Sequence, residues 1–167
     1  LVVEAARAAG AYPIIALDIH NGRLASAIEM GANATLHADT TDPEKAIRDL
    51  LPSGHADVVV ETSGAQSMVE LSYRLASDGG RAVLVGVPRH DEPARIDTLP
   101  LHFGMTFTGS KGGQVRPQID IPRLLTLCEM GIFRVNSLPI EEFTLVEVRD
   151  GIAALRSGTP GRVIVQM

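Results

Sequence analysis

Short apolar runs alternate with helical patterns along the first half of the chain. Continuous apolar runs bounded by turn residues predict strands, and apolar residues spaced three and four apart predict helices. No two-residue hairpin turn joins successive strands, so the order predicts right-handed strand–helix–strand units and a parallel sheet covered on both faces. The predicted strands are 13–17, 34–38, 56–61 and 81–88, and the helices between them have apolar faces made by Leu24, Ala27, Ile28 and Met30, by Ala46, Ile47, Leu50 and Leu51, and by Met68, Leu71 and Leu75.

Residues that start and stop helices support this order. Gly10 and Gly31 each follow a helical pattern, where glycine commonly ends a helix. Asp42 and Pro43 form an N-cap and a first-turn proline. The segment 63–66 fits a capping box that starts a helix. The glycine pair 79–80 predicts the end of this same helix.

The pattern is looser in the second half. A polar turn covers 89–93, a strand is predicted over 105–110, and a last strand over 161–167. A second capping box, 144–147, opens a further helix. The predicted inward faces are Ile121, Leu124, Leu125 and Cys128 in the helix 120–130, and Leu145, Val148, Ile152 and Leu155 in the helix after 144.

Composition narrows the possible functions. The 167 residues fit one domain, and 45% apolar with 21% charged residues is ordinary for a globular chain. A formal net charge of −5 argues against nucleic-acid and membrane partners, which favour a basic face. No apolar run approaches the ~20 residues of a membrane span. The single cysteine, Cys128, excludes an internal disulfide and a four-cysteine zinc site, and we expect a cytoplasmic setting.

Asp18 is the most informative candidate for chemistry. It ends the apolar run 13–17 and precedes a polar turn and a helix. In a nucleotide-binding α/β sheet, an acid at the tip of the second strand accepts hydrogen bonds from the adenosine ribose, and it repels a 2′-phosphate, which favours NAD over NADP. The alternative is that Asp18 only caps the helix that follows.

The other polar candidates have simpler interpretations beside the functional ones. Glu61 follows a buried strand and fits either a general base or a structural acceptor for backbone amides. Cys128 on an apolar helix face is expected to be a packed side chain. Arg23 could be a solvated residue of the first helical turn. The five histidines show no metal-ligand spacing and are expected on the surface or in turns.

Seven short segments occur in an order that resembles the nucleotide-binding half of the medium-chain, zinc-type alcohol dehydrogenases. The resemblance covers essentially the whole chain, and each motif alone is weak. The segments are Ala9-Gly10-Ala11, Asp18 with Arg23, Met30-Gly31-Ala32, Val60-Glu61-Thr62-Ser63-Gly64, residues 80–87, residues 105–110, and Leu155-Arg156-Ser157-Gly158 with Gly161-Arg162-Val163-Ile164.

The resemblance implies a doubly wound, Rossmann-like α/β fold and a set of NAD-binding residues, none of them catalytic and none a metal ligand. Asp18 and Arg23 would bind the adenosine ribose, Ile19 and Ser63 would flank the adenine, and Thr62 would line the same cleft. The backbone of Val85, Gly86, Val87 and Ser110 would hold the nicotinamide carboxamide. Arg162 would approach the pyrophosphate, where a guanidinium fork suits two phosphate oxygens.

The resemblance also implies what the chain lacks. Its Gly-rich turn and first strand would precede Leu1, so we interpret 1–167 as the NAD-binding, C-terminal part of a larger dehydrogenase whose catalytic domain holds zinc. Gly112 stands where some relatives have a bulky residue. In the typical strand order the first strand is central. Without it, unpaired backbone groups would remain inside the protein, and we expect the chain alone not to fold stably.

Three functions remain in competition. The leading one is the cofactor-binding part of an NAD-dependent alcohol or polyol dehydrogenase that acts on a small alcohol or aldehyde. The second is an S-adenosylmethionine-dependent methyltransferase, whose ribose-binding strand has a similar pattern around Asp18. The third is a non-catalytic nucleotide-binding or dimerisation module. The resemblance also implies a homodimer or homotetramer that pairs through the edge strand 105–110.

Overall fold

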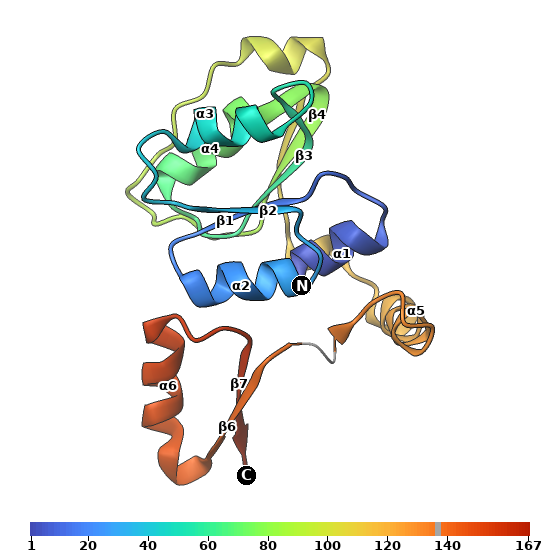
Figure 1. Cartoon of the computed structure of the whole chain (residues 1–167), viewed down its shortest axis with the longest axis vertical. Helices are drawn as coiled ribbons and strands as arrows, with labels where there is room; N and C mark the ends of the chain where they lie inside the picture. Colours follow the sequence, from blue (N-terminus) through green and yellow to red (C-terminus); the bar gives the residue numbers. More distant parts are fainter. Residues whose placement is uncertain (136–137) are drawn as a thin grey trace. The chain divides into compact units, whose positions relative to one another are not determined.

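Strands and helices alternate along the chain in a computed structural model that describes residues 1–135 and 138–167 (Figure 1). Every strand pair in this part of the chain is parallel, as the sequence predicts. The elements are α1 (Val2–Ala8), β1 (Ile15–Asp18), α2 (Asn21–Glu29), β2 (Ala34–His37), α3 (Pro43–Leu50), β3 (Ala56–Glu61), α4 (Gln66–Leu75), β4 (Ala76–Leu84), β5 (Thr106–Gly109), α5 (Pro117–Glu129), β6 (Ile140–Thr144), α6 (Val148–Ser157) and β7 (Arg162–Gln166), with 3-10 helices over Leu99–Phe103, Gly112–Gln114 and Leu145–Glu147.

Contacts between residues divide the chain into two compact units. The terminal unit consists of Leu1–Pro43 and Ile121–Met167, and the middle unit consists of Glu44–Asp120. The terminal unit contains the two-stranded sheets β1–β2 and β6–β7, and the middle unit contains the three-stranded sheet β3–β4–β5.

The middle unit packs helix α4 against its parallel sheet. Val59, Ala82 and Phe107 lie side by side in register on β3, β4 and β5. Tyr73 from α4 meets this face, with its ring edge-on to Phe107 at a centroid distance of 5.2 Å. Tyr73, Ala82 and Met105 are all buried and form the centre of the core. The carboxyl ends of the three strands therefore meet at one edge of a well-packed sheet.

The first 43 residues of the terminal unit form helices beside the pair β1–β2. Ile14, Ala27 and Ala32 are buried together, with Val3 and Ala6 of α1 packed against them. Among the described residues, β1 pairs only with β2, and β3 pairs only with β4, so each keeps one unpaired edge. The expectation that the chain does not fold stably alone stays a prediction.

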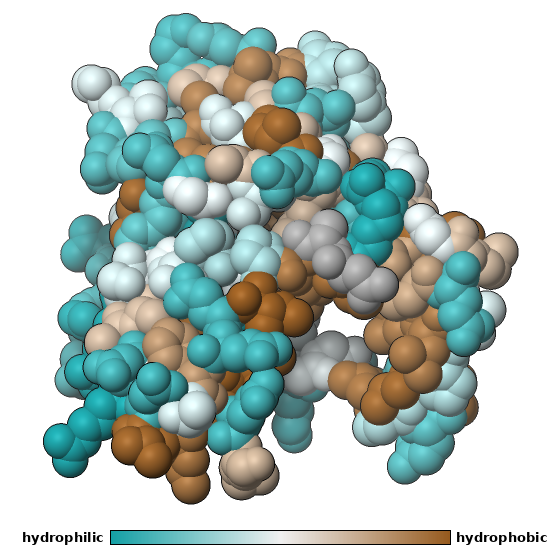
Figure 2. Space-filling model, turned by 60° about the horizontal axis from the view of Figure 1, so that its bottom comes forward, coloured by the Kyte–Doolittle hydropathy of each residue, from teal (hydrophilic) through white to brown (hydrophobic). Residues whose placement is uncertain are grey.

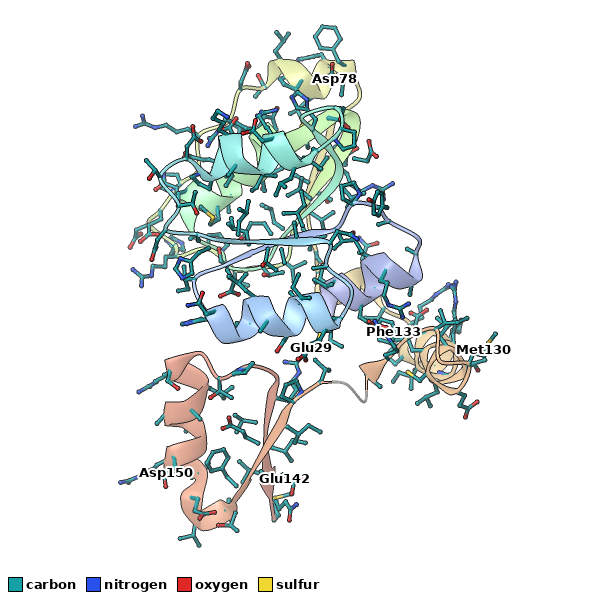
Figure 3. The ribbon with its side chains drawn as sticks, in the orientation of Figure 1. Glu29, Asp78, Met130, Phe133, Glu142 and Asp150 are labelled. Carbon is teal, nitrogen blue, oxygen red and sulfur yellow. The ribbon has the colours of Figure 1, made fainter. Side chains whose placement is uncertain are left out.

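Strand β6, helix α6 and strand β7 form a strand–helix–strand element in the same unit (Figure 1). The capping box 144–147 is confirmed, because Glu147 accepts hydrogen bonds from the Thr144 amide at 2.9 Å and from its hydroxyl at 2.8 Å. Glu142, labelled in Figure 3, accepts a hydrogen bond from Gln166 across the two strands. Strand β6 itself was not predicted, because acidic residues interrupt its short apolar pattern.

The predicted boundary between α4 and the next strand is wrong. The helix ends at Leu75 and β4 begins at Ala76, so the glycine pair lies inside the strand. Gly79 has a φ of +75° at a point where the register between β3 and β4 shifts. A side chain on Gly80 would lie 2.9 Å from the carbonyl oxygen of Asp57. These glycines allow an irregular strand to run close to its neighbour and do not stop a helix.

Several predicted apolar faces are not buried in this chain. Ile121, Leu124 and Leu125 on α5 are exposed, and so is Ile28 on α2. On and before α6, Leu145, Val148, Ile152 and Leu155 are exposed, and only Gly151 of the helix is buried. Val58 is 54% exposed, so β3 is not covered on both faces as predicted. Apolar side chains accordingly reach the surface between polar ones on the face drawn in Figure 2.

The first predicted capping box is also wrong. The N-cap of α4 is Ala65, without a side-chain hydrogen bond. The Ser63 hydroxyl donates to Glu61 instead, and Gln66 donates to Glu70 one turn along the helix. Within the described ranges, no helix combines the length and the apolar character that a bilayer crossing needs.

Candidate functional site

Asp18 lies at the carboxyl end of β1, where its carboxylate is about one-third exposed. Its Oδ1 accepts a hydrogen bond of 2.9 Å from the backbone N–H of His20, and its side chain is 30% exposed. The N-cap of α2 is His20, so Asp18 does not cap this helix, and the alternative interpretation from the sequence is wrong. Among the described residues Asp18 Oδ2 accepts no hydrogen bond, so it can accept one from a ligand at the end of the strand.

Arg23 and Ile19 lie beside this carboxylate. The guanidinium of Arg23 is 3.8 Å from Asp18 Oδ2, and the Arg23 side chain is 43% exposed. An ion pair this exposed stabilises the fold little. Ile19 is 58% exposed directly after the strand. The structure thus groups a carboxylate, a cation and an exposed apolar side chain within six residues.

Glu61 ends β3 and organises the loop that follows. It is buried, and its Oε1 accepts hydrogen bonds from the Ser63 amide at 2.6 Å, the Ser63 hydroxyl at 2.5 Å and the Gly64 amide at 3.0 Å. These bonds occupy the carboxylate with its own loop, which fits the structural alternative for Glu61 and not a general base. Thr62 and Ser63 are left exposed at the carboxyl edge of the sheet.

The segment after β4 lies directly on that loop. The amides of Val85 and Gly86 donate to the Glu61 carbonyl oxygen at 2.8 and 3.0 Å. A side chain on Gly86 would lie 2.7 Å from the carbonyl carbon of Ser63. Gly64 has a φ of +73°, and its own Cβ would lie 2.6 Å from the carbonyl carbon of Val87. Two glycines therefore let the two backbones touch, and the exposed side chains of Val85 and Val87 flank the contact.

Ser110 extends the same edge beyond β5. Its amide donates to the Leu84 carbonyl oxygen at 2.7 Å, so it continues the pairing with β4. A cavity of about 280 Å³ opens beside these loops. It is lined by Ser63, Gly64, Ala65, Val87, Arg89 and Glu92. Ligands of open α/β sheets bind beyond the carboxyl ends of the strands, which is where these residues lie.

A second cavity of about 460 Å³ in the middle unit is lined by residues that precede β3 and begin β4. Two of the arginines that line it, Arg74 and Arg48, already bond Glu44 at 2.7 and 3.0 Å. The hydrogen bond from Arg74 is the main cause of the lowered pKa of Glu44, and Arg48 adds to it. We therefore place the candidate site at the carboxyl edge of the sheet and not in this cavity.

Arg162 begins β7 in the terminal unit. Its amide donates to the Pro139 carbonyl oxygen at 2.9 Å, and its side chain is exposed. In the described part of the chain its guanidinium makes no hydrogen bond or ion pair. Arg162 is thus an unneutralised cation that an anion could approach.

The sequence interpretation missed a buried acid in the terminal unit. Glu4 on α1 is 1% exposed and accepts hydrogen bonds from Arg7 at 2.5 Å and from the Arg134 amide at 2.7 Å. Arg7 also donates to the Ile132 carbonyl oxygen, and Arg134 to that of Met30. The hydrogen bond from Arg7 is the main cause that lowers the pKa of Glu4 to about 2. We call Glu4, Arg7 and Arg134 the Glu4 clasp.

No residue of this chain is assigned to a metal. Among residues 1–135 and 138–167, no three His, Cys, Asp or Glu side chains are grouped closely enough to hold an ion. Cys128 is half-buried on α5. The terminal unit, in contrast, has groups that suit parts of an adenine dinucleotide, since Asp18 offers an accessible carboxylate for a ribose and Arg162 an unpaired cation for a phosphate.

Replacing Glu61 with glutamine is expected to destabilise the whole protein by about 1–2 kcal/mol. The amide offers one acceptor oxygen where the carboxylate serves three donor groups, and charge-assisted hydrogen bonds are lost. Urea unfolding measures the change. Asp91→Asn, whose side chain is 99% exposed, is the matched control and should not alter the midpoint. Equal stability of Glu61→Gln and the wild type would contradict the role given to this carboxylate.

Comparison with known proteins places the chain in a family. The family model described as "Zinc-binding dehydrogenase" matches residues 1–129. The L-threonine 3-dehydrogenase of Bacillus licheniformis is 30% identical over 168 residues, which cover 99% of this chain and 47% of that protein. The chain spans about half the length of the relatives it matches.

Solved structures agree with this match. The structure of benzyl alcohol dehydrogenase from Acinetobacter calcoaceticus has a TM-score of 0.91 at 27% identity, covering 99% of this chain and 45% of that one. An "alcohol dehydrogenase zinc-binding domain protein" from Burkholderia ambifaria has a TM-score of 0.89 at 31% identity, covering 99% and 44%. These parallel α/β structures confirm the Rossmann-like fold class. The chain belongs to the zinc-binding dehydrogenase family.

Proposed function

We propose that this chain supplies the NAD-binding region of a zinc-type alcohol or polyol dehydrogenase. The observation that carries the proposal is the accessible carboxylate of Asp18 at the carboxyl end of a parallel strand, with a cation 3.8 Å away. Such an acid accepts hydrogen bonds from both hydroxyls of an adenosine ribose. It also repels a 2′-phosphate, so we propose NAD and not NADP as the cofactor.

The other predicted residues take roles that match their surroundings. Arg23 would reinforce the ribose contact, and the exposed side chain of Ile19 would cover one face of the adenine. Arg162 would bind the pyrophosphate, for which its free guanidinium is suited. For the middle unit, taken by itself, the family resemblance assigns Thr62 and Ser63 to adenine contacts and the backbone of Val85, Gly86, Val87 and Ser110 to the nicotinamide carboxamide.

The chain's contribution to the reaction would be binding and orientation. NAD, when bound, supplies the acceptor for the hydride of a small alcohol. None of the residues placed at the candidate site is assigned proton transfer, because Glu61 is committed to its own loop. A zinc that stabilises the alkoxide would belong to residues other than those described, and the identity of the alcohol or aldehyde would depend on them too.

Two alternatives from the sequence receive different support. The methyltransferase alternative is disfavoured, because membership of the zinc-binding dehydrogenase family points to a dinucleotide and because the described strand pairs are all parallel. A non-catalytic nucleotide-binding module would share the same site. Turnover of an alcohol by the whole protein would separate it from a dehydrogenase.

Calorimetric titration of the whole protein tests the proposal. NADH should bind, with NADPH weaker by at least about tenfold, since one unfavourable charge contact of ~1.4 kcal/mol corresponds to that factor. S-adenosylmethionine should give no heat of binding. Tighter binding of S-adenosylmethionine than of NADH would overturn the proposal.

We also propose that two copies pair through the free edge of β5. Ser110 donates toward β4, so by alternation Thr106 and Thr108 face β4, and Phe107 and Gly109 turn their N–H groups to the free edge. Gly109 has open space around its Cα. Its edge is therefore available to a second strand.

Replacing Gly109 with proline is expected to weaken this dimer about tenfold or more. The proline removes an outward N–H and places its ring at the edge, at a cost of roughly one to two hydrogen bonds. Light scattering over a dilution series measures the dissociation. Thr106→Pro is the contrasting variant, because it removes an inward N–H and should lower stability instead. An unchanged mass of Gly109→Pro at every concentration would contradict pairing through this edge.

A further inference from the structure

The ring of His20 lies directly against the turn that joins α6 to β7. Helix α6 ends at Ser157, and Gly158 follows in the left-handed region with a φ of +84°. A Cβ placed on Gly158 would lie nearest to Nε2 of the His20 ring and 2.5 Å from its Cε1, closer than van der Waals contact allows. Gly158 is buried and His20 is half-buried, so the ring covers the glycine. The sequence interpretation, which placed His20 at the surface or in a turn, missed this contact.

The same two segments also lie near each other at a second point. A Cβ on Gly22, two residues after His20, would lie 3.6 Å from Cγ of Pro160, which is ordinary van der Waals contact. The start of α2 thus lies beside the turn 158–161 at Gly158 and again near Pro160. Both segments belong to the terminal unit. The turn leads straight into Arg162, the free cation described above.

His20 also holds the ribose-binding acid through its backbone. Its N–H donates to Asp18 Oδ1 at 2.9 Å. One residue therefore touches the acid through its main chain and the turn before Arg162 through its ring. The two groups proposed for the adenosine ribose and for the pyrophosphate are linked by this single residue.

We propose that His20 is a positioning residue for the adenosine diphosphate part of the cofactor. Its ring packs on Gly158 and fixes the turn 158–161, so that the Arg162 guanidinium is held where the pyrophosphate binds. This inference rests on the proposed function. The role is one of packing, because the ring meets an α-carbon and no hydrogen bond to it occurs among the described residues.

His20→Ala in the whole protein is expected to weaken NADH and ADP-ribose binding about tenfold, the loss typical of one loosened charge-assisted hydrogen bond. The rate at saturating cofactor should be unchanged. The amides of Thr159 and Arg162, which donate at 3.2 and 2.9 Å within and beside the turn, should exchange their hydrogens faster. His102→Ala, on an exposed histidine of the middle unit, is the matched control.

Two further variants separate positioning from other roles. His20→Phe keeps a flat ring and should restore binding to within about twofold of the wild type, whereas a contact that needed the imidazole nitrogens would not be rescued. In the background of Arg162→Ala, His20→Ala should add no further loss, because its effect acts through Arg162. Additive losses in this cycle, failure of His20→Phe to rescue binding, or unchanged affinity of His20→Ala would each overturn the inference.

The wild type distinguishes this inference from the proposed function. If the wild type binds NADH and His20→Ala binds it equally well, the positioning role is wrong and the proposed function stands. If the wild type binds no NADH in calorimetry, the proposed function is overturned and the inference with it.

Discussion

Replacing Asp18 with asparagine in the whole protein is expected to weaken NAD binding about 30-fold and to lower the preference for NAD over NADP by at least about 100-fold. The asparagine oxygen can still accept the His20 amide, so the local turn is kept. With that oxygen engaged, an NH2 group replaces Oδ2 and cannot accept hydrogen bonds from the two ribose hydroxyls, which costs about 1 kcal/mol for each bond.

The gain for NADP has a separate cause. The negative charge of Asp18 repels a 2′-phosphate, and its removal should strengthen NADP binding about tenfold after allowance for solvent screening at a side chain that is 30% exposed. Titration calorimetry with both cofactors measures the two effects. Asp39→Asn, on a side chain that is 82% exposed, removes the same charge elsewhere in the terminal unit and should leave the ratio unchanged. A ratio of affinities that stays at the wild-type value in Asp18→Asn would contradict the assignment.

Replacing Glu4 with glutamine is expected to destabilise the whole protein by about 3 kcal/mol at neutral pH. The Glu4 carboxylate is buried between two guanidinium groups, and its pKa falls from 4.5 to about 2 in the folded state. A difference of this size corresponds to roughly 3 kcal/mol of stability at ~1.4 kcal/mol per unit. Arg7 and Arg134 are 32% and 44% exposed, so in the variant water can solvate the two guanidinium groups that lose their ion pairs with Glu4.

The pH dependence follows from the direction of this shift. Because the folded pKa is depressed, the contribution of Glu4 is complete above pH 4.5 and is lost as the pH falls toward 2. Urea unfolding between pH 7 and pH 3 should show the wild type and Glu4→Gln converging as the pH falls. Glu29→Gln, on an exposed acid of α2 labelled in Figure 3, is the control. The difference between its free energy of unfolding and that of the wild type should stay constant over this pH range. A constant difference between wild type and Glu4→Gln across this range would show that the clasp does not depend on the charge of Glu4.

Much of the fold could be predicted from local patterns in the sequence. An apolar run that ends in an acid predicted β1 with Asp18 at its tip, and a β-branched run ending in Glu61 predicted β3. The parallel pairing followed from the absence of hairpin turns. These features depend on residues close together in the chain, where spacing and turn chemistry decide the conformation.

Other features depend on what each segment meets in space. The apolar stripes of α5 and α6 show that these helices are amphipathic, but the pattern does not say whether anything covers the stripe, and in this chain both are exposed. Gly79-Gly80 has the composition of a helix stop, yet it lies inside β4, where Gly80 runs close to the backbone of Asp57.

The candidate site shows the same division. Asp18 and Glu61 are recognisable because acids at strand ends are unusual within apolar runs. His20 beneath the turn 158–161 and Glu4 beside Arg134 join residues more than 120 positions apart, and no periodic signal connects them. Glu4 also has the ordinary position of an acid in a first helical turn, which concealed its burial.

A crystal structure of the whole protein with NAD bound tests the central claim most directly. We predict that an Asp18 carboxylate oxygen lies about 2.5–2.7 Å from a hydroxyl oxygen of the adenosine ribose, the range of a charge-assisted O–H···O bond. A bound NAD whose ribose hydroxyls contact other side chains, with Asp18 facing solvent, would contradict it.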